Sequence, residues 1–395
     1  MKFIDNPIVP FLLFLFYMFH QLVMPEETPL QTVSIFAFLL YALVAAVKLH
    51  QVRNTFIYWI DIFLLIQLLY FAVAFPTFSS GNVHFMSVAV NQIKSVLVVM
   101  MPIYTYFWYG VRGKLTKTHI IWFSIVFIGL SIPQFYYLAN WLMEHHSWIN
   151  EYNETTNNTA YYFLQGFIFL PLLTTKNRKL SLGVLLIIVF YLLLGVKRGA
   201  LLCFVFALPF YLKHYFSKTR FYTIPLIVLL VFLASNWFID YFSDMTYMQT
   251  RIEETMEGNS STRDIIYGKI LNYVFDSHFS IFGLLFGYGF NESVNIAGNL
   301  AHNDWLELLS GFGLFSVFVY LNIMIGVSRF RKNTIDNDIK ACLTMGLVIW
   351  FLQTFFSMAY ASTSFQFIVI YGLCGISMYE KKRKQLMSQE IVLKK

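Results

Sequence analysis

The sequence predicts an all-α protein, a polytopic bundle of about 12 membrane-spanning helices that forms a single domain over residues 1–395. Composition points to this class, because 58% of the residues are apolar and only 12% are charged. Soluble globular proteins have about 45–50% and about 25%. Long apolar runs also recur along the chain, and in lipid each run must satisfy its own backbone hydrogen bonds as a helix. A soluble enzyme, a disordered tail and a secreted disulfide scaffold are excluded.

The predicted spans follow one another closely up to residue 240 and resume after residue 301. The segment 159–174 is the least typical of them, because it is short and carries Gln165, Gly166 and Pro171. The spans are 7–24, 29–47, 56–75, 85–108, 119–141, 159–174, 180–195, 198–213, 221–240, 302–327, 340–359 and 362–379.

Charge sets the predicted orientation. With twelve spans and a cytoplasmic N-terminus, most of the 28 basic residues fall in cytoplasmic loops and most of the 21 acidic residues fall outside, as the positive-inside rule requires. Omitting 159–174 would reverse every later loop, so we keep it as a span. Both termini are therefore predicted to be cytoplasmic. The net charge of +7 belongs to a rim that faces anionic membrane lipids, and no nucleic-acid partner is expected.

The longest hydrophilic segment, 241–301, is predicted to be a large extracytoplasmic loop within the transmembrane domain. Loops of this length are usually functional or disordered. This one contains an apolar pattern of its own, IIYGKILNYVFDSHFSIFGLLFGYGF, which favours one or two short helices along the membrane surface.

Basic residues on the predicted outer side need a reason. Lys197 and Arg198 lie in LLLGVKRGALL, a short reversal between two apolar spans. Arg can bind phosphate oxygens in a bidentate manner, so the pair is a candidate anion site. The competing interpretation is a pair that snorkels to lipid headgroups.

Two more arginines stand in the long loop. Arg263 follows Ser260, Ser261 and Thr262, which are typical helix caps, and a helix N-terminus itself favours an anion. A local ion pair of Arg263 with an acidic neighbour is the alternative. Arg251 is a weaker candidate for substrate binding, because acidic residues follow it directly.

A polar group marks the point where the loop returns to the membrane. His302 stands first, and Asn303, Asp304 and Glu307 follow it. A histidine with an ordinary pKa of about 6.5 is largely neutral at pH 7 and can accept a proton from a hydroxyl. An interfacial histidine beside a polar helix cap is the alternative. Within the spans, Asp61 and Lys94 are predicted to form an ion pair.

Metal and cofactor chemistry is not predicted. The three cysteines lie singly in apolar runs, and His145–His146 has no ligand at a suitable spacing. No phosphate-binding nucleotide loop is present.

In this order, four segments resemble the O-antigen polymerase and O-antigen ligase superfamily of bacterial envelope enzymes. They are Lys197-Arg198-Gly199 before Ala-Leu-Leu, Ser261-Thr262-Arg263-Asp264, Phe286–Gly289, and His302-Asn303-x-x-Leu306-Glu307. The resemblance covers about 180–330, and the first 180 residues match only as hydrophobic spans.

The resemblance implies a metal-independent, inverting glycosyltransferase on the outer face of the bacterial inner membrane. Its donor would be a glycan linked to undecaprenyl diphosphate, and a chain-length regulator and a flippase of the pathway would be its partners besides membrane lipids. Arg198 and Arg263 would stabilise the departing diphosphate, and His302 would deprotonate or orient the acceptor hydroxyl. Lys197, Arg251, Asn303, Asp304 and Glu307 would bind substrate or orient the histidine.

Three functions stay open at this point. The first is a polymerase that joins lipid-linked repeat units of O-antigen, capsule or exopolysaccharide. The second is a ligase that passes finished glycan to lipid A core or another acceptor. The third is a polysaccharide or ion transporter, which should show repeat symmetry and polar residues in broken helices at mid-membrane.

Overall fold

The computed structural model describes residues 5–24, 28–52, 54–78, 83–145, 157–217, 263–362 and 364–393. In these ranges the chain is all-α without any strand, which confirms the all-α part of the predicted fold class. The predicted span 221–240 and Arg251 lie outside the described residues, as does the first part of the long loop.

The helices differ widely in length, and several are broken by proline or glycine. Short 3-10 turns (η1, η2) and one π-helical turn (η3) connect some of them. In chain order the elements are α1 Ile8–Phe19, η1 His20–Leu22, α2 Pro29–Gln51, η2 Thr55–Ile57, α3 Tyr58–Phe78, α4 Val83–Met100, α5 Pro102–Val111, α6 Lys117–His145, α8 Ala160–Phe167, α9 Leu170–Lys176, α10 Arg178–Leu194, α11 Arg198–Ser217, α14 Arg263–Asn272, η3 Tyr273–Ser277, α15 Ile281–Phe286, α16 Glu292–Ala297, α17 Asp304–Asn333, α18 Asn337–Phe356, α19 Ala359–Ser362 and α20 Ser364–Leu393.

Several helices are long and apolar enough to cross a membrane, which indicates a membrane protein. In the described part there are 6 of them, and the number of twelve spans stays a prediction. They are Pro29–Gln51, Thr55–Phe75, Lys117–Leu142, Arg198–Ser217, Asp304–Asn333 and Asn337–Phe356.

The segment 159–174 crosses the bundle in its interior. Its start lies beside the end of α10, since Asn157 donates its backbone N–H to the Gly195 carbonyl at 2.9 Å. Its end lies beside the start of α10, where the Thr174 and Ser181 hydroxyls are 2.8 Å apart. Nearly all side chains of α8 and α9 are buried. The polar residues that weaken the segment's hydropathy are therefore packed inside protein: the Gln165 carbonyl oxygen accepts from the Phe365 N–H at 3.2 Å.

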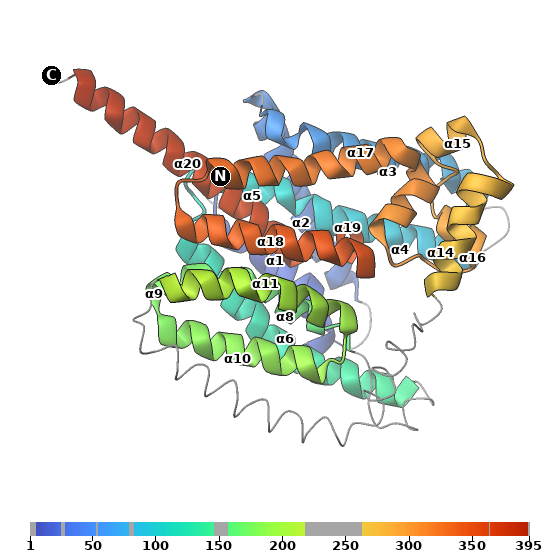
Figure 1. Cartoon of the computed structure of the whole chain (residues 1–395), viewed down its shortest axis with the longest axis horizontal. Coiled ribbons are helices and arrows are strands. Elements are labelled where there is room, and N and C mark those ends of the chain that lie inside the picture. Colours follow the sequence, from blue (N-terminus) through green and yellow to red (C-terminus); the bar gives the residue numbers. More distant parts are fainter. Residues whose placement is uncertain are drawn as a thin grey trace.

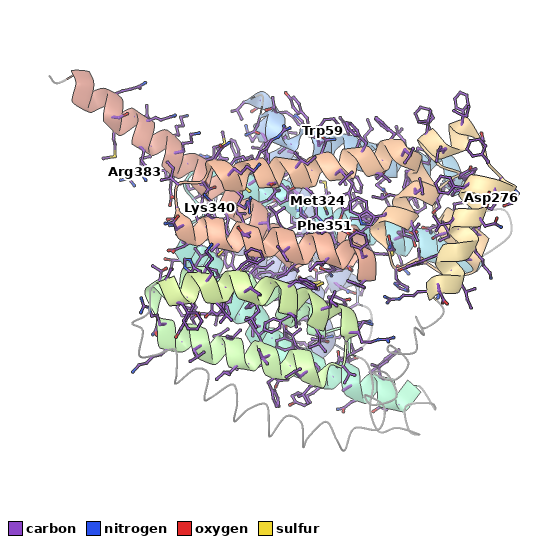
Figure 2. The ribbon with its side chains drawn as sticks, in the orientation of Figure 1. Trp59, Asp276, Met324, Lys340, Phe351 and Arg383 are labelled. Carbon is purple, nitrogen blue, oxygen red and sulfur yellow. The ribbon has the colours of Figure 1, made fainter. Side chains whose placement is uncertain are left out.

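The two ends of the bundle differ in character. The predicted cytoplasmic loops meet at one end through ion pairs of Arg112 with Asp5 and of Lys117 with Asp336 and Glu380. This is the end at which both chain termini lie, and the short helices α14, α15 and α16 gather at the other (Figure 1). Figure 2 shows the labelled Arg383 and Asp276 at these opposite ends. The assignment of the basic end to the cytoplasm stays a prediction.

The predicted ion pair between Asp61 and Lys94 is wrong. The Asp61 carboxylate instead accepts a hydrogen bond from the Tyr104 hydroxyl at 2.6 Å and lies 3.4 Å from His50 Nε2. The Lys94 ammonium stands over the Tyr17 ring, 5.9 Å from its centroid. Both groups lie on helices with several polar neighbours, and the sequence alone does not indicate which neighbour packs closest.

Glycines lock the short helices onto α17. Gly313 interrupts α17 with φ 72° and ψ −176°, which frees carbonyl groups of the preceding turn. The Tyr288 N–H donates to the Ser310 carbonyl at 2.9 Å, and the Gly289 N–H donates to the Gly311 carbonyl at 3.1 Å. Gly287, with φ 80°, lies so close that a Cβ there would be 2.3 Å from the Gly311 oxygen. The Phe-Gly-Tyr-Gly segment thus supplies hydrogen-bond donors to carbonyl groups that the kink leaves without a partner in α17.

Gly313→Ala is expected to lower the free energy of unfolding by at least about 2 kcal/mol, because φ is left-handed there and the added Cβ would meet backbone. That Cβ would lie 2.4 Å from the Gly287 nitrogen. Thermal unfolding of the purified protein in detergent measures the loss. Gly129→Ala is the control, since nothing lies within 4 Å of its Cβ position. Equal melting temperatures for both variants would contradict this account of the kink.

Candidate functional site

A partly open cavity of about 550 Å³ lies beside the start of the short helix α14. Segments far apart in the sequence contribute to it: α4, the start of α8, the turn between α10 and α11, the start of α14, the residues before α17, and the stretch from the end of α18 through α19. Its lining residues are Asn91, Gln92, Ser95, Asn158, Tyr161, Tyr162, Lys197, Arg263, Leu300, His302, Phe356, Ser357, Met358, Ala361 and Ser362.

Three of the predicted site residues meet in this cavity. Lys197 comes from the turn before α11, Arg263 is the first residue of α14, and His302 lies two residues before α17. Lys197 and His302 are 105 positions apart in the sequence. Among the described residues that line the cavity none is acidic. The site therefore combines two cations with one imidazole and offers a binding place for an anion.

Helix N-termini add to this positive field. The helices α8, α11, α14 and α17 all begin beside the cavity, because Asn158, Lys197, Arg263 and His302 line it. The first N–H groups of a helix have no partner within the helix, and its dipole favours negative charge at this end. The converging N-termini and the side-chain cations thus favour the same kind of ligand.

The turn that carries Lys197 is held in a strained form. Val196, a β-branched residue, has φ 44°, which is a rare conformation for such a side chain. Close packing explains how it is held: a Cβ on Gly199 would lie 2.6 Å from the Tyr161 hydroxyl, and one on Gly195 would lie 2.8 Å from the Ala160 Cβ. His302 likewise has φ 51°. Of the three lining residues that carry a cation or an imidazole, two therefore lie on or next to backbone with positive φ, as functional groups often do.

The surroundings of His302 keep its imidazole neutral. Its pKa is lowered from the ordinary value of 6.5, first by partial loss of water and then by the positive charges of Arg263 and Lys197. A lowered pKa means that the neutral form, which can accept a proton, prevails at pH 7.

The three polar residues Asn303, Asp304 and Glu307, which follow His302, make their contacts within the protein. Asn303 caps α17, and its Oδ1 accepts from the N–H groups of Trp305 and Leu306 at 3.0 and 3.2 Å. Asp304 accepts from the Tyr320 hydroxyl at 2.7 Å. All three residues are buried and none lines the cavity, so in this structure their contacts are with protein.

Glu307 joins two parts of the loop to α17. Its carboxylate accepts from the Ser293 hydroxyl at 2.6 Å and from the Ala301 backbone N–H. Ala301 directly precedes His302, so this carboxylate fixes the backbone from which the imidazole projects. Glu307 is thus placed as a positioning residue in the structure, which is one of the two roles that the resemblance implies for it.

The remaining predicted residues lie elsewhere. Arg198 is the first residue of α11 and does not line the cavity, so the turn presents Lys197 to it. Arg251 lies outside the described residues. Among the described residues no group of three His, Cys, Asp or Glu side chains could hold a metal ion.

Sequence reasoning missed the uncharged polar residues of the cavity, above all Asn91, Gln92 and Ser95 on α4. A signal was present, since Asn91 and Ser95 are spaced i and i+4 and therefore share one face of a helix. Polar side chains on one face of a predicted span indicate a face turned away from lipid.

Comparison with protein-family models finds none that matches this chain, and comparison with curated proteins finds no match either.

Glu307→Ala is expected to lower the melting temperature of the detergent-purified protein, because the buried Ser293 hydroxyl and Ala301 N–H would both lose their acceptor. Each unsatisfied group costs about 1–3 kcal/mol. Glu307→Gln keeps carbonyl acceptance and should recover part of the loss. The control is Glu144→Ala, an exposed glutamate of α6. A melting curve of Glu307→Ala that superimposes on that of the control would refute the positioning role.

Proposed function

We propose that the protein is a membrane glycosyltransferase that polymerises lipid-linked polysaccharide repeat units. The donor is a glycan on undecaprenyl diphosphate and the acceptor is a sugar hydroxyl of another lipid-linked unit, on the outer face of the bacterial inner membrane. The observation that carries the proposal is the meeting of Lys197, Arg263 and His302 in one cavity. The residue resemblance described above agrees with it.

The reaction is a single displacement at the anomeric carbon. The acceptor oxygen forms a bond to that carbon, the bond from the carbon to the diphosphate oxygen breaks, and undecaprenyl diphosphate leaves with the electron pair. The proton of the acceptor hydroxyl goes to His302. Attack from the face opposite the leaving group inverts the configuration.

The cations serve the leaving group. Negative charge grows on the diphosphate as the bond breaks, and preorganised positive charge at that place lowers the barrier. Arg263 acts together with the N-terminus of α14, and Lys197 acts from the turn before α11. In this proposal Lys197 takes the phosphate contact that the resemblance implies for Arg198.

A transporter is the less supported alternative. The break between α8 and α9 falls at Ile168 and Phe169, which are fully buried among apolar side chains. Transporters instead use such breaks to expose backbone to their cargo. The charged residues that line the cavity, Lys197 and Arg263, instead lie at the starts of α11 and α14 and not at this break.

His302→Ala and Arg263→Ala are each expected to abolish long-chain surface glycan in a deletion strain that is complemented with the variant genes. The first removes the proton acceptor and the second removes charge stabilisation, and loss of one such group typically costs about 10²- to 10³-fold in rate. Gel electrophoresis of surface glycan measures chain length, and immunoblotting checks that the protein is present. His50→Ala and Arg329→Ala are the controls, since neither residue lines the cavity.

The deletion strain itself separates the two transferase functions. Glycan that stops at a single repeat unit indicates a polymerase. Loss of all transferred glycan indicates a ligase. Normal polymer from both His302→Ala and Arg263→Ala would mean that the assigned site is wrong.

The pH dependence of polymerisation by the purified protein should show its acid limb below pH 6.5, because the pKa of His302 is lowered and activity needs the neutral imidazole. Lys197→Ala removes one of the charges that lower this pKa, so the acid limb should move to higher pH. Lys197→Arg retains the charge and should leave the limb in place. Rates are compared after each profile is scaled to its own maximum. An unmoved acid limb in Lys197→Ala would contradict the electrostatic coupling.

A further inference from the structure

One side of the cavity has no role in the chemistry proposed above. Asn91, Gln92 and Ser95 project from α4, and Ser357 and Ser362 lie before and at the end of α19. All five carry uncharged hydrogen-bonding groups. These five residues form the neutral part of the cavity lining, and the cations and the imidazole come from other segments of the chain.

Gln92 stands out within the neutral part. Its side chain is 6% exposed and lines the cavity, and its carbonyl oxygen Oε1 has no hydrogen-bond partner. Buried polar atoms are nearly always paired, and an unpaired one costs free energy that a ligand can recover. Gln92 therefore brings to the cavity lining an amide whose hydrogen-bonding capacity the protein does not fully use.

The neighbouring groups narrow the chemistry of that ligand. Asn91 and Ser95 share one helix face and offer both donors and acceptors without charge. The rings of Tyr161, Tyr162 and Phe356 also line the cavity and provide flat apolar surface. Amides and hydroxyls beside aromatic rings suit a sugar ring, whose hydroxyl edge forms hydrogen bonds while its C–H face packs on an aromatic ring.

Size limits how much of a glycan the cavity can hold. A volume of about 550 Å³ falls in the range of sites for drug-sized ligands, about 300–1,000 Å³. The cavity can therefore enclose a diphosphate and the sugar next to it, but not a long glycan.

We propose that Asn91, Gln92 and Ser95 form a subsite for the sugar bonded to the carrier diphosphate, and that this subsite selects an uncharged ring that bears hydroxyl or acetamido groups. The inference rests on the proposed function, since it names the part of the substrate that the charged groups do not contact. The amide pair of Asn91 and Gln92 matches the donor and the acceptor of an acetamido group, and recognition of the carrier-proximal sugar makes this subsite specificity-determining.

Equilibrium binding to the full chain in lipid nanodiscs tests the subsite with two probes, undecaprenyl diphosphate and undecaprenyl diphosphate N-acetylglucosamine. The wild-type protein should bind the glycosylated probe about 10-fold more tightly, which is the effect of one or two net hydrogen bonds. Gln92→Met retains the shape of the side chain but removes its polar atoms, and should reduce the preference to less than about 3-fold. Its affinity for the bare carrier should not change.

A matched control exists in Gln134→Met. Gln134 is also 6% exposed and also has an unpaired Oε1, but it does not line the cavity. It should leave the sugar preference intact. Asn91→Ala is a second variant at a more exposed position of the subsite and should lower the preference as Gln92→Met does. Lys197→Ala should weaken binding of both probes about equally.

The outcomes separate the subsite from the proposed function. Equal wild-type affinity for both probes overturns the subsite and leaves the transferase proposal standing. Full sugar preference in both Gln92→Met and Asn91→Ala also overturns the subsite. Failure of the wild-type protein to bind either probe overturns both proposals.

Discussion

The site depends on one constraint, which is the positive charge that lies around a single cavity beside the start of α14. Lys197 and Arg263 line this cavity, and several helices begin beside it. Like charges repel more strongly where water is scarce, so an anion between these two cations would lower the electrostatic energy of the site. In the proposed function, the diphosphate of a carrier lipid is that anion.

The same charges set the state of the imidazole. Partial desolvation and the charges of Arg263 and Lys197 lower the pKa of His302. In the proposed reaction the same two cations would therefore attract the leaving group and keep the proton acceptor neutral. This coupling would be lost if the histidine carried an acidic partner at its side. In the structure the nearby carboxylates, Asp304 and Glu307, are instead engaged with Tyr320, Ser293 and Ala301 behind it.

Backbone satisfaction in an apolar medium explains the less regular parts of the fold. The kink of α17 at Gly313 frees carbonyl groups that lipid cannot satisfy, and the Tyr288 and Gly289 N–H groups bind them. These hydrogen bonds fix the short helices at the end of the bundle. They thereby also fix the segment that leads to Ala301 and His302. The break between α8 and α9 is tolerated for a related reason, since it is buried within protein.

Composition and long apolar runs were enough to predict an all-α membrane protein, and basic residues on the predicted outer side were enough to single out Lys197, Arg198 and Arg263. His302 was singled out by the polar residues that follow it. These signals are all local in the chain. Tertiary structure alone decided that Lys197 rather than Arg198 lines the cavity and that Glu307 accepts a hydrogen bond from the Ala301 backbone. It also decided that 159–174 lies in the interior and that Asn91 and Gln92 line the site. These features depend on which helix faces meet. Rotation and packing of helices arise from contacts between segments far apart in sequence, and hydropathy along a single segment carries no record of them.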